Sequence, residues 1–168
     1  ANAINSSGLK LPTYTYYAAA DGITKAIGKG GVGSVRLVGQ GQTNPPGTDE
    51  WDATLKAFKA KYPDGDFTQT RIATVMRMLK RSMKEAGSTK PIKVAAAMEG
   101  MEHTTLWGDV VKMRSSDHQL QMPVRIFAHS DKGIQHDLDN SGFGLVNEST
   151  VTMQEASTPT TCKMKRPS

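Results

Sequence analysis

Asp117 and His118 are the adjacent pair whose side chains could do chemistry, as an orienting carboxylate beside a base, with the hydroxyls of Ser115 and Ser116 just upstream. General-base catalysis needs these groups within hydrogen-bonding reach of one another. Neighbouring residues on an extended segment point to opposite faces, however, and no nucleophile elbow surrounds the serines. We therefore interpret Asp117 and His118 as a structural pair with backbone hydrogen bonds, and we predict that the protein is not an enzyme.

The glycine-rich run from Gly28 to Ser34 has the G-x-G-x-x-G spacing of a phosphate-binding loop. A dinucleotide-binding fingerprint follows a strand and opens a helix. Here we expect the opposite order, with a short helix before the run and a strand at residues 34–40 after it. Ser34 also stands where a phosphate-binding lysine would be needed. The run therefore predicts a turn between a helix and a strand, and no nucleotide cofactor.

Metal-binding patterns are not found among the histidines or around the single cysteine, Cys162. The histidines have no H-x-x-x-H spacing, and Cys162 is far from all of them in the sequence, so we expect no structural metal and no other cofactor. The four histidines are His103, His118, His129 and His136. Cys162 is interpreted either as a free thiol in a loose tail or as a cysteine with a partner elsewhere.

A cluster of aromatic and acidic residues follows the first predicted strand, with Tyr16 and Tyr17 at its end and Asp21 a few residues later. In open α/β sheets, ligands bind beyond the carboxyl ends of the strands. Asp21 could neutralise an ammonium group, while the tyrosines could supply an aromatic wall or a hydroxyl. Alternatively, the tyrosines pack on neighbouring helices and Asp21 caps the helix near Ile23. The residues alone leave both interpretations open.

The 168 residues correspond to one ordinary domain, with 37% hydrophobic residues and a net charge of +5. The charges are mostly interspersed, apart from Lys163, Lys165 and Arg166, so we expect no nucleic-acid partner. No window reaches the run of about 18 apolar residues that a membrane span needs. The opening residues resemble the last turns of a helix that ends at Gly8, so we expect a fragment or a processed product.

The hydrophobic pattern predicts strands alternating with amphipathic helices. Helix signals begin at Thr48 and near Thr68, and they end at Pro63 and Gly87. In the second of these helices the apolar residues form one face and basic residues the other; the apolar set is Ile72, Val75, Met76, Leu79, Met83 and Ala86. The strands are expected at residues 9–17, 34–40, 110–113 and 124–128. This order predicts an α/β sandwich with parallel strands, a late antiparallel pair and an extended tail.

Several short motifs, taken in their order along the chain, resemble the C-terminal part of type I periplasmic binding proteins of branched-chain amino acid ABC transporters. The matching segments are Gly8-Leu9-Lys10-Leu11-Pro12, Thr15-Tyr16-Tyr17, Phe58-Lys59-Ala60-Lys61-Tyr62-Pro63, Ala86-Gly87-Ser88-Thr89, Glu99-Gly100-Met101, Gly108, Met113-Arg114, Asp117-His118-Gln119-Leu120-Gln121 and Cys162-Lys163-Met164-Lys165-Arg166-Pro167. The resemblance implies an incomplete three-layer Rossmann-like sandwich from a fold of two lobes. In that fold three hinge crossings join the lobes, which close on a ligand.

The resemblance also divides the chain. It implies the end of the second lobe and a hinge crossing at residues 1–40, and the C-terminal part of the first lobe with its return strands at residues 41–129. An extended C-terminal arm at residues 130–168 completes the division. The implied function is periplasmic binding of a branched-chain amino acid or similar small carboxylate, with ABC transporter membrane subunits as partners. The implied ligand-binding residues are Asp21 for the α-amino group, Tyr16, Tyr17 and Phe67.

Two features qualify this function. Where many relatives carry a Tyr-Ala segment, this chain has Arg71-Ile72-Ala73, so the ligand class could differ. A ligand-sensing receptor domain of the same fold, acting through a protein partner, is the alternative function. A hydrolase or nucleotide enzyme is disfavoured by the failed motifs. For a fragment with open strand edges and apolar faces, we also expect self-association.

Overall fold

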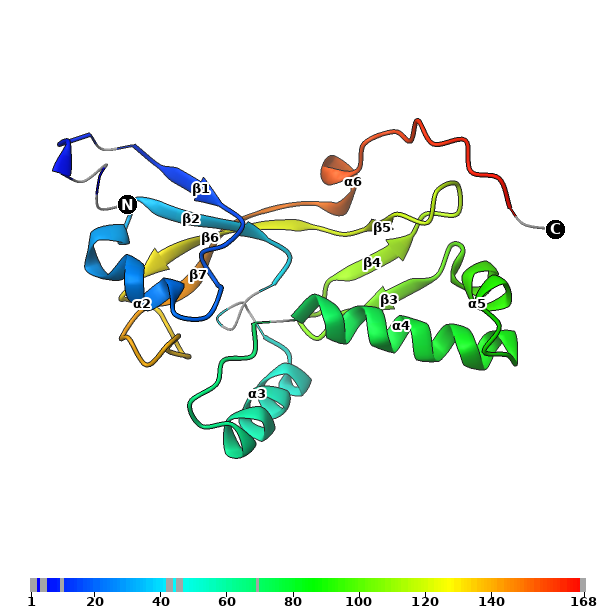
Figure 1. The fold of residues 1–168 in the computed structure, drawn as a ribbon, viewed down its shortest axis with the longest axis horizontal. Helices are drawn as coiled ribbons and strands as arrows, with labels where there is room; N and C mark the ends of the chain where they lie inside the picture. The colour runs from blue at the N-terminus through cyan, green and yellow to red at the C-terminus, as the bar shows by residue number, and fades with distance from the viewer. Residues whose placement is uncertain are drawn as a thin grey trace.

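Two β-sheets organise the chain, as the computed structural model in Figure 1 shows for residues 3, 6–9, 11–41, 44, 47–68 and 70–166. The first sheet has the strand order β1-β2-β6-β7 and the second has the order β3-β4-β5. The first contains β1 (Thr13–Thr15), β2 (Val35–Gly39), β6 (Val124–Ser130) and β7 (Gly144–Val151). The second contains β3 (Glu102–Thr104), β4 (Val110–Met113) and β5 (Leu120–Gln121).

Strand direction differs from the sequence prediction in part. The mixed α/β class is confirmed, but of the described strand pairs only β1 and β2 run parallel. An antiparallel pair late in the chain is present as β6 and β7, although the sequence predicted only the first of these two strands. Because β7 joins the first sheet, part of the segment 130–168, predicted to be an extended arm, is a sheet strand. The uninterrupted extended stretch comes only after residue 156.

Alternation of buried side chains fixes the register of the first sheet. Along β6 every second residue is buried, and Phe127 is fully buried against β2 and β7 residues of the same core. Val35 and Leu37 of β2 and Leu145 of β7 complete the centre of this core. A period of two is what a sheet with one covered face requires, since successive side chains point to opposite faces.

The helices begin and end close to the predicted residues because their signals are local. Their bounds are α2 (Ile23–Ile27), the 3₁₀ helix η1 (Gly28–Gly31), α3 (Asp49–Lys61), α4 (Thr70–Ala86), α5 (Pro91–Met98) and α6 (Met153–Ala156). Thr48 caps α3 as predicted, accepting a hydrogen bond from the Trp51 N–H at 3.2 Å. The glycine-rich run forms η1 and a turn before β2, and a Cβ at Gly31 would lie 2.0 Å from Ile27 Cγ2. Gly31 therefore serves close packing, whereas Gly28 and Gly33 have positive φ angles of 55° and 74°, which other residues rarely adopt.

The buried face of α4 is not the apolar face that the sequence defines. The buried residues are Thr70, Thr74, Met78 and Ser82, whereas Ile72, Val75 and Met76 are 57%, 45% and 57% exposed. Ser82 tolerates burial because its hydroxyl donates to the Met78 carbonyl at 2.8 Å, which satisfies it within the helix. The N-terminal half of the apolar face of α4 thus lies open in this chain, while Leu79, Met83 and Ala86 are half-buried.

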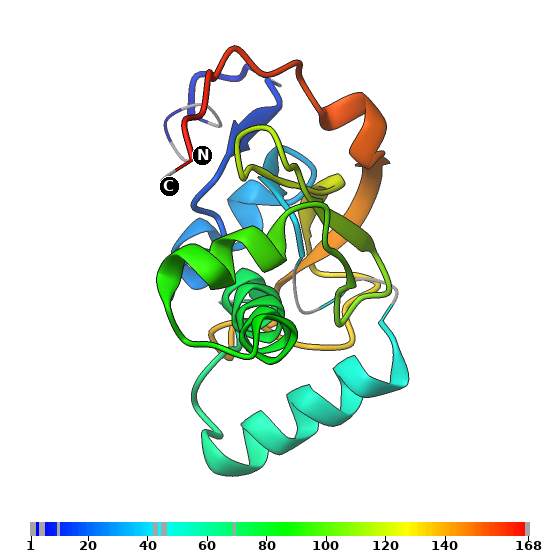
Figure 2. The same ribbon diagram turned by 90° about the vertical axis from the view of Figure 1, so that its right-hand side faces the viewer.

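The chain passes between the two sheets three times. It does so from β2 to α3, from β5 into β6, and from β7 to α6, whose end is tied to the second sheet by a Gln121–Ser157 hydrogen bond of 2.9 Å. Figure 2 shows the second sheet with α4 and α5 on one side of it. An ion pair of Arg125 on β6 with Asp109, before β4, joins the sheets at 2.6 Å.

Some predicted features fall at residues that the structure describes only in part. The helix end predicted at residues 1–8 and the loop at residues 41–47 lie partly outside the described residues, as do Lys10 and Pro167. Gly8 is described and has a φ of 72°, the left-handed conformation expected just beyond a helix. None of the described helices combines the length and the apolar character of a membrane span.

Candidate ligand-binding site

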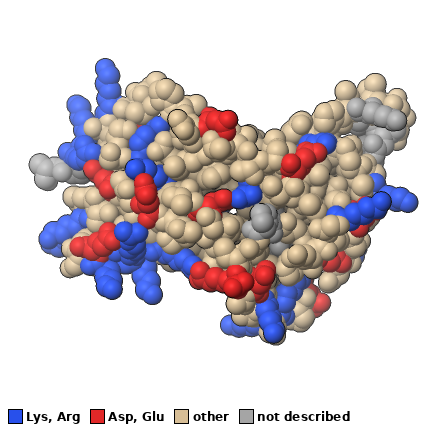
Figure 3. Space-filling view, turned by 180° about the vertical axis from the view of Figure 1, so that it is seen from behind, with Lys and Arg blue, Asp and Glu red and all other residues tan. Residues whose placement is uncertain are grey.

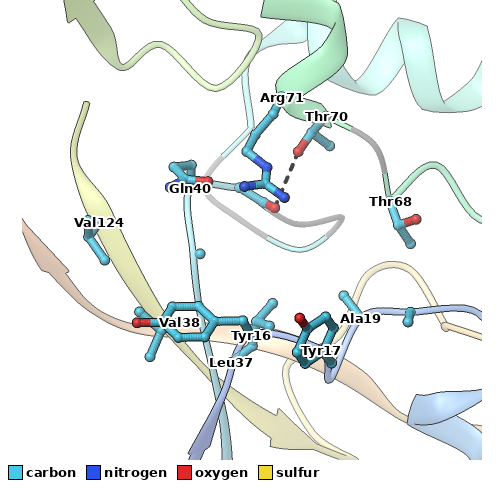
Figure 4. Close-up of a pocket in the computed structure, with 13 residues that line it drawn as sticks. Tyr16, Tyr17, Ala19, Leu37, Val38, Gln40, Thr68, Thr70, Arg71 and Val124 are labelled. Atoms are coloured by element: carbon cyan, nitrogen blue, oxygen red, sulfur yellow. Dashed lines mark hydrogen bonds between the residues drawn. The ribbon is translucent and has the colours of Figure 1, made fainter. Parts of the chain in front are cut away.

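A cavity of about 440 Å³ opens beyond the carboxyl ends of the two parallel strands, β1 and β2 (Figure 4). Its size is within the range of small-molecule sites. The described residues that line it are Tyr16, Tyr17, Ala19, Ala20, Leu37, Val38, Gly39, Gln40, Gly41, Thr68, Thr70, Arg71 and Val124. The location agrees with the expectation that ligands bind at this edge of an α/β sheet.

Tyr16 and Tyr17, predicted as ligand contacts, both line this cavity. They directly follow β1 and are 77% and 76% exposed, so their rings pack on little of the protein. Among the described residues, neither hydroxyl has a hydrogen-bond partner. The alternative prediction, that the tyrosines pack on neighbouring helices, does not match this exposure. Two aromatic faces and two hydroxyls are therefore available to a ligand.

Arg71 lies across the cavity from these tyrosines, at the second position of α4 (Figure 4). Its neighbour Thr70 fixes the helix start against β2 by donating to the Gly41 carbonyl at 3.4 Å. The Arg71 guanidinium has no hydrogen-bond or ion-pair partner within the described part of the chain. Arg71 is also the one charged side chain among the described lining residues. The cavity therefore carries a net positive charge.

Asp21, predicted to bind an ammonium group, is exposed and follows Ala20, the last lining residue of that loop. It does not cap α2, which was the alternative. The Asp139 carboxylate takes that role, accepting hydrogen bonds from the Gly22 N–H at 2.8 Å and the Lys25 N–H at 3.1 Å. Asp21 thus follows a lining residue in the sequence but does not line the cavity itself, and it has no hydrogen-bond partner among the described residues.

Phe67, the fourth predicted ligand contact, is not among the residues that line the cavity. Its ring is half-buried and lies 5.7 Å from Trp51 and 5.3 Å from Phe58, measured between centroids. It precedes Thr68, which does line the cavity. The structure therefore places Phe67 behind the wall, where it supports the segment that leads into α4.

Asp117 and His118 do not contact each other and instead hold the C-terminal arm. The Arg114 guanidinium binds the Asp117 carboxylate and donates to the Thr158 carbonyl at 2.6 Å. His118 Nε2 lies 3.0 Å from a Glu99 carboxylate oxygen. Both side chains are only partly buried, but Asp117 does make a backbone hydrogen bond as predicted, accepting from the Gln119 N–H at 3.1 Å.

Glu99 and Asp117 are held ionised by these contacts. Hydrogen bonds from Arg166 and then from His118 lower the pKa of Glu99 to about 2. Hydrogen bonds from Arg114 and then from Thr160 lower the pKa of Asp117. Both carboxylates are thus anchors for the arm, and a base with a lowered pKa of this kind is poorly suited to take up a proton near neutral pH.

A family model described as "Periplasmic binding protein" matches residues 1–133. This chain belongs to that family. The resemblance stated from the sequence motifs is therefore confirmed, and the family is one of binding proteins. A comparison with curated protein sequences finds no match.

Solved periplasmic binding proteins share the fold of this chain. A leucine-, isoleucine-, valine-, threonine- and alanine-binding protein from Brucella ovis, in a closed conformation, superposes with a TM-score of 0.83 at 23% identity over 99% of this chain. A solute-binding protein of an ABC transporter from Rhodopseudomonas palustris BisB5, in complex with 3,4-dihydroxybenzoic acid, gives 0.70 at 12% identity over 99%. A branched-chain amino acid transporter protein from Rhodopseudomonas palustris CGA009 gives 0.66 at 19% over 92%.

This periplasmic binding protein chain is much shorter than those structures. It covers 43% of the Brucella chain, 40% of the BisB5 chain and 39% of the CGA009 chain. The chain thus spans less than half the length of each of these solved structures. The cavity described above lies within that part.

Sequence reasoning did not predict the lining residues contributed by β2 and by the start of α4. Gln40 and Gly41 follow β2, which was correctly predicted, so the rule that placed Tyr16 at a carboxyl strand end could have found them too. Thr70 and Arg71 give no such signal, because their place at the cavity depends on how α4 packs. Arg71 was noted from the sequence only as a departure from relatives.

Proposed function

We propose that this chain is part of the solute-binding component of an ABC importer, located in the periplasm. Its ligand would be an amino acid of the branched-chain type, or a similar small carboxylate, held between two lobes. The cavity beyond β1 and β2, with its exposed Tyr16 and Tyr17, is the observation that carries the proposal. Membership of the periplasmic binding protein family supports it.

The ligands of the structural neighbours span the proposed class. The Brucella protein is named for binding leucine and other amino acids, and the BisB5 protein holds an aromatic acid. In an amino acid complex, Asp21 would approach the ammonium group, and Tyr16 and Tyr17 would form the wall. Phe67 would act from behind, by holding Thr68 in place.

The division into lobes follows from the same proposal. Residues 1–40 would end the second lobe and make one hinge crossing, and residues 41–129 would belong to the first lobe. Residues 130–168 would form the C-terminal arm. ABC transporter membrane subunits would receive the ligand. The passage from β2 to α3 supports the boundary near residue 40, whereas β6 pairs with β2, so residues 124–129 would lie with the second lobe.

Affinity in such a clamshell comes from enclosing the ligand, which excludes water and strengthens its polar contacts. A single wall leaves the bound ligand exposed to water. We therefore expect the 168-residue chain to bind leucine only weakly, in the millimolar range, with amide resonance shifts at Tyr16, Tyr17, Ala19 and Arg71 in an NMR titration. Glycine amide, which lacks both the side chain and the carboxylate, is the matched control and should shift nothing.

Two results would contradict this proposal in different ways. Micromolar leucine affinity in a calorimetric titration would show that the site is complete within these residues. No shift at the cavity with any amino acid or small carboxylate would remove the basis for a solute-binding role.

The exposed part of the apolar face of α4 (Ile72, Val75 and Met76) would pack, in a whole binding protein, on parts of the first lobe outside this chain. With these 168 residues alone, we propose that a second copy covers this face. Figure 3 shows Lys and Arg side chains gathered at the end of the molecule formed by α4, α5 and the C-terminal arm. Like charges around the face oppose pairing, so salt should strengthen self-association.

Sedimentation velocity tests this pairing. Met76→Lys should weaken self-association by about tenfold or more, since it places a charge in a face that must be desolvated. Tyr62→Lys changes a similarly exposed apolar residue on α3 and should leave association unchanged. A monomer at all concentrations and salt levels, or equal effects of the two variants, would refute it.

A further inference from the structure

We propose that Arg71 selects the ligand of this site, by binding a carboxylate group, and that the preferred ligand is an aromatic monocarboxylate. The inference rests on the proposed function and narrows its ligand class. It starts from the charge of the cavity, the position of Arg71 and the nature of the facing wall.

The charge of the cavity favours an anion. Arg71 is the one charged residue among the described lining residues, and no acid stands beside it on the cavity wall. Arg71 is exposed, whereas arginines that lie deeper in the described chain are paired, as Arg36 is with Glu148 and Arg125 with Asp109. The Arg71 guanidinium keeps all its donors available, and a carboxylate can accept two parallel hydrogen bonds from such a fork.

The position of Arg71 strengthens this preference. It is the second residue of α4, a helix of 17 residues, so the positive end of the helix dipole lies at the same part of the cavity. The first N–H groups of a helix have no acceptor within it. Thr68 adds a hydroxyl to this wall, whereas the Thr70 hydroxyl already donates to the Gly41 carbonyl. A carboxylate here would meet donors and positive potential from one direction.

The opposite wall favours an aromatic ring. Tyr16 and Tyr17 present largely exposed rings across the cavity from Arg71, as Figure 4 shows. Offset or edge-on contacts between aromatic rings contribute beyond the area that they bury. Their free hydroxyls can also bind a polar group at the far end of the ring. A ligand with a carboxylate at one end and an aromatic ring beyond it therefore matches both walls.

An α-amino acid matches less well. Its ammonium group needs an acceptor or a countercharge, and no acid is among the described lining residues: Asp21 follows the lining residue Ala20 but does not line the cavity. The ammonium would also lie close to the Arg71 guanidinium when the carboxylate binds there, since the two groups share one carbon atom. Like charges at that separation disfavour binding.

NMR titration of the 168-residue chain with 4-hydroxybenzoate and with leucine tests the inference. We expect 4-hydroxybenzoate to bind at least about tenfold more tightly than leucine, with shifts at Tyr16, Tyr17 and Arg71. Arg71→Ala should weaken 4-hydroxybenzoate binding by about tenfold to a hundredfold, as expected for hydrogen bonds to charged groups. Arg71→Lys should be intermediate, because it keeps the charge but loses the fork.

Lys80→Ala is the matched control. It removes the same charge from the same helix, nine residues or about 13 Å further along, where Lys80 is exposed and outside the cavity. It should leave 4-hydroxybenzoate binding within about twofold of the unaltered chain. A fall equal to that of Arg71→Ala would show a general effect of net charge and overturn the inference.

The remaining outcomes separate the inference from the proposed function. Binding of 4-hydroxybenzoate that is unaffected by Arg71→Ala, or tighter binding of leucine than of 4-hydroxybenzoate, overturns the role of Arg71 and leaves the solute-binding role intact. If neither compound shifts a resonance at the cavity, both the inference and the proposed function fail.

Discussion

Asp109→Ala is expected to lower the free energy of unfolding by about 3–5 kcal/mol, because it leaves the Arg125 guanidinium buried without its countercharge. The two side chains are 18% and 8% exposed. Arg125 donates from Nη2 to Asp109 Oδ1 at 2.6 Å and from Nε to Oδ2 at 3.1 Å. After the substitution only Thr150 Oγ1, at 3.2 Å from Nη1, would remain as an acceptor. Urea unfolding followed by circular dichroism measures the loss.

The Glu102–Lys112 pair provides the control for this prediction. Its atoms lie 3.0 Å apart, but its side chains are 59% and 44% exposed. Exposed pairs contribute about 0–1 kcal/mol, so Glu102→Ala should have little effect. If Asp109→Ala costs no more than Glu102→Ala, the pair between the sheets does not stabilise the protein as its burial suggests.

This ion pair matters for the site because of its place in the chain. Arg125 follows Val124, a lining residue, and β6 begins directly after the passage from β5. Asp109 is on the other side, in the loop before β4. The pair therefore holds the cavity edge of the first sheet against the second sheet. Loss of the pair should also weaken ligand-induced shifts at Tyr16 and Tyr17.

The helices could be predicted from the sequence because their determinants are local. Thr48 and the acids after it mark the start of α3, and Gly87 follows the last residue of α4. Their lengths follow from a 3.6-residue repeat that neighbours do not alter. The strand β7 was not predicted, since its polar residues Asn147, Glu148 and Ser149 give no alternation of apolar side chains. It forms because the backbone of β6 supplies hydrogen-bond partners along its edge, with which β7 pairs in an antiparallel direction.

The burial of α4 could not be predicted, since it depends on which surfaces surround the helix. Thr74, Met78 and Ser82 face the rest of this chain, where Met78 packs with Met101 and Val111. Periodicity identifies an apolar face but not its partner. The residues that α4 buries most deeply in this chain are therefore not the apolar face that its sequence predicts.

Only the part of the site that directly follows strand β1 could be predicted from the sequence. Tyr16 and Tyr17 follow a predicted strand, and the general rule for α/β sheets places a ligand there. Phe67 was placed by resemblance alone, and Asp21 by both the strand end and the resemblance; neither is among the described residues that line the cavity. Arg71 reaches the cavity only through the packing of α4, which no local pattern specifies.

Trp51→Ala is expected to cost about 3–5 kcal/mol of unfolding free energy, the range for removing a large buried aromatic side chain. Trp51 is 1% exposed, and its ring centroid lies 5.7 Å from that of Phe67 and 5.2 Å from that of Trp107. It is the centre of the core that α3 shares with the loop between β3 and β4. A cavity left by Trp51 would not be filled, because Phe67 and Trp107 are held by backbone on different elements.

Tyr62→Ala is the matched control, since Tyr62 is an aromatic residue at the end of α3 and is 48% exposed. It should cost less than about 1 kcal/mol in the same urea titration. Trp51→Ala should also loosen the segment that Phe67 anchors, so cavity resonances at Thr68 and Arg71 should shift without ligand, whereas Tyr62→Ala should leave them in place. If Trp51→Ala unfolds the chain no more easily than Tyr62→Ala does, the aromatic core is not what supports this wall. In that case Thr70, through its bond to Gly41, would be the remaining support of α4 at the site.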